Sequence, residues 1–149
     1  MVYRSVPNKR GAPLFALVLA LALASGTFSS ANSAAVASIK KDWTTFFAGT
    51  TSAKAKIALL QNGPSFATII EGQASSSMAE SVKAKVSAVT LTSATKAKVR
   101  YSLTLGGEPA LTNQTGVAVL QDKTWKVGDQ SFCGLLALEQ VKTPACKGA

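Results

Sequence analysis

The sequence of 149 residues contains no histidine and only two cysteines. Without histidine, the chain lacks the commonest general base and the commonest transition-metal ligand. Two cysteines are too few for a zinc site built from sulfur and imidazole, and no imidazole is present to activate a cysteine nucleophile. Charged residues make up 15% of the chain and apolar residues 47%, a balance that argues against a disordered tail. We therefore expect no metal site and no cofactor.

The first 33 residues have the order of a secretory signal peptide. Arg4, Lys9 and Arg10 precede an apolar run over residues 14–24, and small and polar residues follow the run. The run is about half as long as the roughly 20 apolar residues that cross a bilayer, so an uncleaved membrane anchor is the weaker interpretation. Small residues predict cleavage near residue 33, with residues 22–24 as a nearer alternative. The sequence predicts a protein that is secreted or associated with the cell surface.

Residues 34–149 are expected to form a single domain without a membrane span. This part of the chain carries thirteen basic and seven acidic residues and is therefore moderately basic. In an oxidising destination, Cys133 and Cys146 are expected to form an intramolecular disulfide that contributes about 3 kcal/mol. A free buried cysteine and an intermolecular bridge are the alternatives.

Helices are predicted in the first half of this domain. Apolar residues three to four apart indicate a first helix from residue 36 to about residue 49. Ser52 can cap a second helix, which residues 62–64 would stop. A third, weaker helix is expected from residue 65.

Strands are predicted in the second half, where the apolar period changes to two at residue 82. Two strands are expected over about residues 82–91 and 97–105, the first with a bulge near Ala88. A third strand follows over about residues 111–121, and a fourth strand and a short closing helix come after it. The order defines an α+β domain, with N-terminal helices packed on a curved antiparallel sheet of about four strands.

This order resembles the nuclear-transport-factor-2-like (cystatin-like) fold, a cone whose sheet wraps a long helix and opens into a cavity. Short motifs are also similar to those of the low-molecular-weight secreted antigen family of mycobacteria and related actinobacteria. These motifs are Leu60-Gln61-Asn62-Gly63 with Phe66, Trp125-Lys126-Val127, and Phe132-Cys133-Gly134-Leu135-Leu136. The resemblance covers residues 36–140 and implies a small exported protein of the cell surface or medium without enzymatic activity. The cysteine pair departs from the family pattern, in that not all members need share it.

The cavity implied by this fold predicts a binding module for a small apolar or amphipathic ligand. The candidates for its mouth or lining are Phe66, Tyr101 and Trp125. The competing interpretation is plain core, because aromatic side chains on helix faces and strand interiors are most often buried.

An enzyme is the less favoured hypothesis. Cones of this kind host isomerases and dehydratases that use a carboxylate base beside tyrosine or histidine, and here Tyr101 is the one tyrosine after residue 33. Periodicity places Asp42 on the exposed side of its helix, and the spacing of the carboxylates selects none as a base. The seven are Asp42, Glu71, Glu80, Glu108, Asp122, Asp129 and Glu139. A buried carboxylate facing Tyr101 would be the sign of catalysis.

A row of cations on the first two predicted strands offers a third hypothesis. Its members are Lys83, Lys85, Lys96, Lys98 and Arg100. Such a row can attract an anionic cell-surface polymer or lipid. The alternative is a solvated outer face that discourages aggregation, and the predicted bulge leaves open whether all five share one side. Nucleic acid is disfavoured because no aromatic residues interleave with the lysines to stack on bases.

Overall fold

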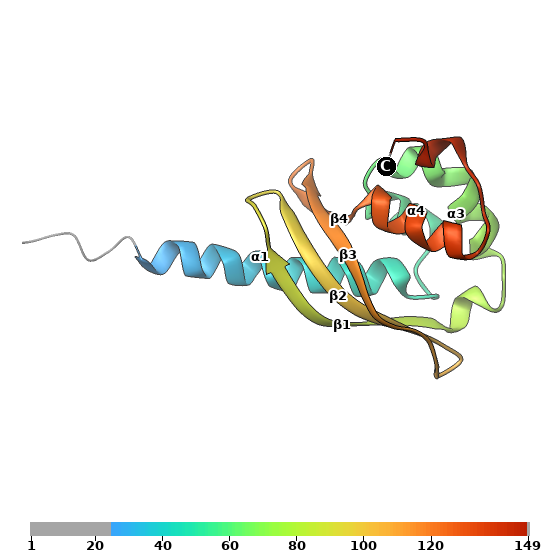
Figure 1. The fold of residues 1–149 in the computed structure, drawn as a ribbon, viewed down its shortest axis with the longest axis horizontal. Coiled ribbons are helices and arrows are strands. Elements are labelled where there is room, and N and C mark those ends of the chain that lie inside the picture. The colour runs from blue at the N-terminus through green and yellow to red at the C-terminus, as the bar shows by residue number, and fades with distance from the viewer. Residues whose placement is uncertain (1–24, 149) are drawn as a thin grey trace, which may run out of the picture.

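The computed structural model describes residues 25–148, so the predicted apolar run of the signal peptide lies outside the described residues. Helices come first, a four-stranded sheet follows, and one helix closes the chain (Figure 1). The elements are α1 (Ser25–Phe47), α2 (Ala53–Ala58), η1 (Gly63–Phe66), α3 (Ala67–Ala74), η2 (Ala79–Ser81), β1 (Val82–Leu91), β2 (Lys96–Leu105), β3 (Glu108–Gln121), β4 (Thr124–Val127), α4 (Asp129–Leu138) and η3 (Pro144–Cys146). The predicted α+β class is confirmed.

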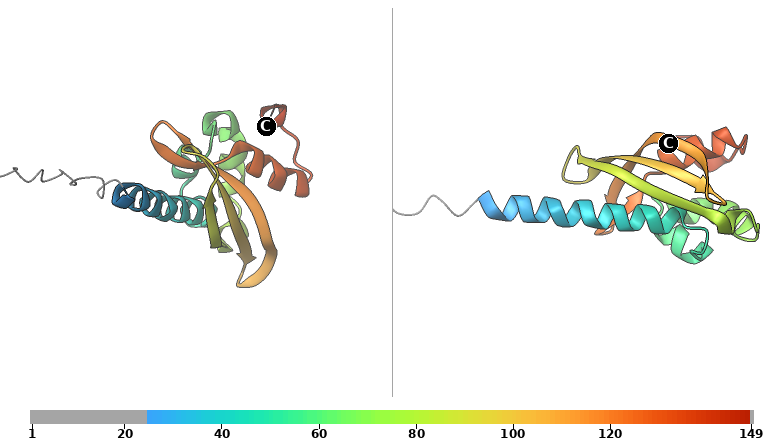
Figure 2. Two further views of the ribbon diagram at one scale, coloured as in Figure 1. Left: turned by 60° about the vertical axis from the view of Figure 1, so that its left-hand side comes forward. Right: turned by 90° about the horizontal axis from the view of Figure 1, so that it is seen from below.

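Helix α1 is long and lies along one face of the sheet, beyond which its N-terminal part extends (Figures 1 and 2). It begins well before the expected start at residue 36. Residues 30–34 are exposed, whereas the expected apolar stripe is buried from Ile39 to Phe47. Cleavage near residue 33 would therefore leave the buried stripe of α1 intact.

The second helix begins at its expected cap but ends at Ala58, before the predicted stop at residues 62–64. Ser52 caps α2, its hydroxyl accepting a hydrogen bond of 3.3 Å from the backbone N–H of Ala55. After α2, Asn62 adopts a left-handed conformation with φ of 54°. Gly63 is required next, because a side chain there would overlap the carbonyl oxygen of Ile57. The third helix starts as the 3-10 turn η1 and continues as α3.

The sheet has the order β1-β2-β3-β4, and every neighbouring pair is antiparallel. The register of β1 against β2 shifts between Val86 and Ala88, which confirms the predicted bulge. Strand β3 begins at Glu108, earlier than expected, because Gly106 and Gly107 make a tight turn with φ of 62° and 89°. Glycine tolerates these positive values without steric cost.

The core lies between α1 and the concave face of the sheet. The Trp43 ring lies 5.2 Å from Tyr101 of β2, and Phe47 stacks on the same tyrosine at 5.5 Å. Phe46 meets Phe132 of α4 edge to face at 5.7 Å. Helices α1 and α4 therefore share one aromatic core with the sheet. Within residues 25–148, no helix combines the length and apolar character needed to cross a bilayer.

Candidate functional site

A cavity of about 490 Å³ lies where β1 begins, β2 ends and β3 begins. The C-terminal end of α1, parts of α2, α3 and α4, and the segments that connect them form the rest of its wall. Most of the lining is apolar and includes Phe46, Phe47, Ile70, Leu103, Leu111 and Leu136. Cavities of this size and character are typical of small-molecule sites.

Two exposed apolar side chains mark the opening of the cavity. Met78 and Leu138 both line it, although they are 65% and 64% exposed. Single exposed apolar side chains are common on protein surfaces, but apolar side chains that continue into an apolar pocket are typical of ligand-binding grooves. An apolar molecule that enters the cavity would pass between surfaces that are already apolar.

The cavity wall also contains two charged side chains among the described residues, Lys56 of α2 and Glu139 at the end of α4. Glu139 is exposed, and its carboxylate accepts a hydrogen bond of 3.0 Å from the Gln73 side chain. Within residues 25–148, the Lys56 ammonium has neither an ion-pair partner nor a hydrogen bond. Burial lowers the pKa of Lys56 from its ordinary value, because the charged form is partly removed from water.

The three aromatic residues predicted for the cavity do not line it. Phe66, Tyr101 and Trp125 are buried in the core and are not part of the lining. Phe66 contacts the lining residue Phe132 edge to face at 5.3 Å, and Tyr101 stacks on the lining residue Phe47. These side chains therefore lie in the hydrophobic core, as the competing interpretation of the sequence had it. Strand alternation identified the inward direction of Tyr101 and Trp125 but not where α1, which covers the sheet, ends.

The carboxylates do not converge on Tyr101. Burial raises the pKa of the Tyr101 hydroxyl, and no carboxylate among residues 25–148 is hydrogen-bonded to it. Periodicity predicted that Asp42 is exposed, but the side chain is partly buried. Desolvation raises the pKa of its carboxyl, and the nearby charge of Lys41 partly offsets this rise. Five other acids are exposed: Glu71, Glu80, Glu108, Asp122 and Glu139. In the described part of the chain, no three potential metal ligands cluster together.

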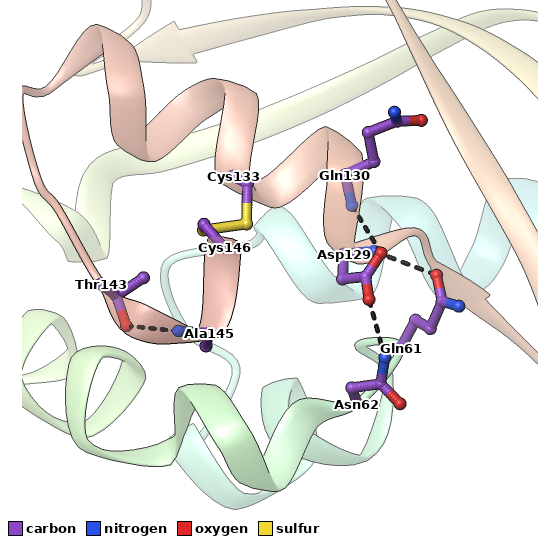
Figure 3. The surroundings of a disulfide bond; sticks show 8 residues. All are labelled: Gln61, Asn62, Asp129, Gln130, Cys133, Thr143, Ala145 and Cys146. Carbon is purple, nitrogen blue, oxygen red and sulfur yellow. Dashed lines mark hydrogen bonds between the residues drawn. A yellow bond between two sulfur atoms is a disulfide. The ribbon is translucent and has the colours of Figure 1, made fainter. Parts of the chain in front are cut away.

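The Leu-Gln-Asn-Gly motif fastens the helical segment to the start of α4. Leu60 is fully buried and forms an isolated bridge to Val127 of β4. The Gln61 side chain accepts a 3.2 Å hydrogen bond from the Asp129 backbone N–H, and the Asn62 side chain donates one of 2.7 Å to the Asp129 carboxylate (Figure 3). This motif, which carried the family resemblance, has a structural role.

The predicted disulfide between Cys133 and Cys146 is present, with a Cα–Cα distance of 5.7 Å (Figure 3). It joins α4 to the C-terminal turn η3. Because α4 also supplies Leu135, Leu136 and Leu138 to the cavity wall, the bond lies on an element that shapes the cavity.

The row of five cations lies on one side of the sheet, and we call it the basic face. It consists of Lys83, Lys85, Lys96, Lys98 and Arg100, all of which are exposed. Lys83 and Lys85 face Thr104 and Ser102 before the bulge, and beyond it Arg100 and Lys98 face Ala88 and Thr90. The bulge thus keeps the cations of both strands on the side opposite the buried residues. Among residues 25–148, the basic face contains no ion pair, since the one present joins Lys126 to Asp122.

The fold and the cavity define a small α+β protein whose curved sheet and helices enclose an apolar pocket. Residues 32–143 match the family described as "Low molecular weight antigen MTB12, C-terminal domain". The chain belongs to this family, which confirms the antigen family that the sequence motifs resembled. No curated protein and no solved structure gives a significant match, so the likeness to nuclear-transport-factor-2-like folds stays a prediction.

Proposed function

We propose that this protein is an exported, non-enzymatic binding protein that holds a small apolar or amphipathic ligand in the cavity. The observation that carries the proposal is the cavity itself, about 490 Å³ in volume with a mainly apolar lining. Its size falls in the range typical of ligand sites, and the exposed Met78 and Leu138 give it an apolar entrance. Burial of apolar ligand surface would supply most of the binding energy.

Export is supported by two independent features. The first 33 residues have the basic, apolar and small-residue order of a signal peptide. The Cys133–Cys146 disulfide is of the kind that persists in oxidising compartments. We therefore place the protein at the cell envelope or in the medium.

Binding without catalysis fits the chemistry of the cavity wall better than an isomerase or dehydratase activity does. General acid–base catalysis needs a proton donor or acceptor held against the substrate. Tyr101 lies behind the lining residue Phe47, and Glu139 is exposed and bonded to Gln73. Lys56, the other titratable group of the wall, is hydrogen-bonded to no second acid or base among residues 25–148. The chain has no histidine that could take either role.

The test is binding of N-phenyl-1-naphthylamine, a neutral apolar dye whose fluorescence rises in apolar surroundings. We expect the wild-type protein to bind the dye and Leu111→Trp to bind it much more weakly, because the larger ring would occupy the cavity. Thr90→Trp is the matched control, since Thr90 is exposed on the opposite side of the sheet. Equal binding by the wild type and Leu111→Trp, with both folded, would overturn the proposal.

Native mass spectrometry of the protein from culture medium gives a second measurement. A bound ligand would add mass under native conditions and leave the denatured mass unchanged. The denatured mass would also locate the cleavage site, which we expect near residue 33. A full-length mass would contradict cleavage of the leader.

A second candidate function is binding of an anionic cell-surface polymer by the basic face. Alternate residues along a strand lie about 6.6 to 6.8 Å apart, so Lys96, Lys98 and Arg100 form a linear row of charges. No acidic partner among residues 25–148 neutralises these cations. The exposed large apolar side chains, Met78, Leu138 and Val141, lie elsewhere in the chain, which favours a linear polyanion over a lipid surface.

This second function predicts salt-sensitive retention on an anionic polysaccharide resin. Changing Lys96, Lys98 and Arg100 to serine should abolish the retention. The same charge change at Lys54, Lys123 and Lys142, which are exposed elsewhere, should preserve most of it. Retention that persists in high salt would count against the basic face, and binding to anionic vesicles alone would favour lipid.

A further inference from the structure

Lys56 is the one cation in the cavity wall formed by the described residues. Its ammonium makes no ion pair and no hydrogen bond with residues 25–148. The nearby polar groups do not compensate, because the Gln73 side chain is bonded to Glu139. A partly buried cation without a partner has lost some of its hydration and gained no protein contact in return.

We propose that the natural ligand is an amphiphile with a single anionic head group, which pairs with the Lys56 ammonium while its apolar body fills the cavity. This inference rests on the proposed ligand-binding function and adds the chemical class of the ligand. The charge pattern favours one orientation, because Glu139 would repel the same head group.

The burial of Lys56 supports this assignment. Burial lowers the pKa of the ammonium, which means that its charged form is less favoured in the cavity wall than in water. An anionic head within hydrogen-bond distance would favour the charged form again, and the ion pair would be stronger than at an exposed site because less water screens it. A simple carboxylate is the smallest head group that meets this requirement.

The experiment compares palmitic acid with 1-hexadecanol, which has the same number of carbon atoms and a neutral head. Each is used at pH 8 to displace N-phenyl-1-naphthylamine from the wild-type protein and from two variants. The wild type should bind the acid about tenfold more tightly than the alcohol, a difference of about 1.4 kcal/mol. Lys56→Gln should bind both equally and retain the affinity for the alcohol.

The matched control is Lys54→Gln, which removes an exposed charge from the same helix, outside the cavity wall. This variant should keep the tenfold preference, as should Lys56→Arg, which retains the charge. Thermal unfolding of each variant would establish that it is folded.

The outcomes separate this inference from the proposed function. If the wild type binds acid and alcohol equally, the head-group inference fails and ligand binding stands. If the preference survives in Lys56→Gln, the anion contact lies elsewhere and the role of Lys56 is overturned. If neither compound displaces the dye at any concentration, the cavity does not accept chain amphiphiles and both proposals fail for this class of ligand.

Discussion

The concave face of the sheet has two halves that are filled in different ways. In the first, which we call the closed half, Trp43 and Phe47 of α1 pack on Val99 and Tyr101, and these side chains are buried. In the second, the cavity half, Leu103 and Leu111 point toward an open volume of about 490 Å³. The same strands, β2 and β3, contribute to both halves.

The difference arises from where α1 ends. The helix covers the sheet as far as Phe47, and the following Gly49 donates a hydrogen bond of 2.9 Å to the carbonyl of Val82. This bond turns the chain away at the start of β1. Strand residues beyond that point have the alternation of a buried surface but are no longer covered by α1. The cavity therefore follows from a helix that ends before the strands beneath it do.

The largest expected effect tests whether the closed half carries the stability. Trp43→Ala should lower the free energy of unfolding by about 3–5 kcal/mol, because it empties a fully buried site. Leu111→Ala in the cavity half should cost about 1 kcal/mol, since Leu111 is only half-buried and already borders free space. Urea unfolding of both variants would measure the contrast. Similar losses would mean that the two halves are packed equally well.

A somewhat smaller effect is expected from the disulfide, which acts on the cavity half. Reducing Cys133–Cys146 should cost about 2–4 kcal/mol, because the unfolded chain gains freedom. Hydrogen exchange should rise first in α4 and only later in α1 and β2. A variant with both cysteines changed to serine should have the lower stability from the start and should not respond to reductant. A uniform rise in exchange over the whole molecule would contradict a local role.

The elements could be predicted from the sequence because each is specified locally. Ser52 caps α2, only glycine fits at residue 63, where a side chain would overlap the backbone, and a change of apolar period marks β1. The bulge near Ala88 was visible as a slip in alternation. The start of α1 was placed too late, because residues 30–34 are exposed and show no apolar stripe.

The candidate site could be predicted only in part. Alternation of apolar and polar residues shows which strand side chains point inward, but it does not show whether other side chains pack against them. Tyr101 and Leu103 have the same pattern, yet only Leu103 lines the cavity. Lys56 was missed because it lies in a six-residue helix with little periodicity. A usable signal was the pair of lysines, Lys54 and Lys56, which cannot both take the same face of a helix.

Two glycine-to-alanine substitutions should change the free energy of unfolding in opposite directions. A Cβ on Gly116 would lie 2.8 Å from two carbons of the Trp43 ring, so Gly116→Ala should cost about 1–3 kcal/mol. Gly72 lies in α3 beside the cavity with no atom within 4 Å of such a Cβ, and Gly72→Ala should stabilise the protein by about 0.5–1 kcal/mol. Thermal unfolding measures both. A destabilised Gly72→Ala would show that the added methyl group is not accommodated at this exposed position of α3.

The smallest effect concerns the partly buried charge on the helix of the closed half. Burial raises the pKa of the Asp42 carboxyl above its ordinary value of 3.8, so the folded protein binds this proton more tightly than the unfolded chain does. The resulting stability is fully present below about pH 3.8 and is lost as the pH rises through the folded pKa. At pH 7 Asp42→Asn should therefore raise the melting temperature by a small amount, corresponding to well under about 1 kcal/mol because the carboxyl is still partly in water.

The pH dependence of this gain separates burial from a favourable contact. The gain of Asp42→Asn should shrink toward zero at pH 3, where the wild-type carboxyl is also neutral. Glu71→Gln is the control, since it neutralises an exposed carboxylate that has no ion-pair partner among residues 25–148. Lys56→Gln should also raise the stability at pH 7, because burial disfavours its charge as well. If Asp42→Asn lowers the melting temperature at pH 7, the carboxylate has a stabilising partner. Of the two partly buried charges, only Lys56 would then be destabilised by its burial. Lys56 lies in the cavity wall, where we propose that an anionic ligand stabilises its charged form.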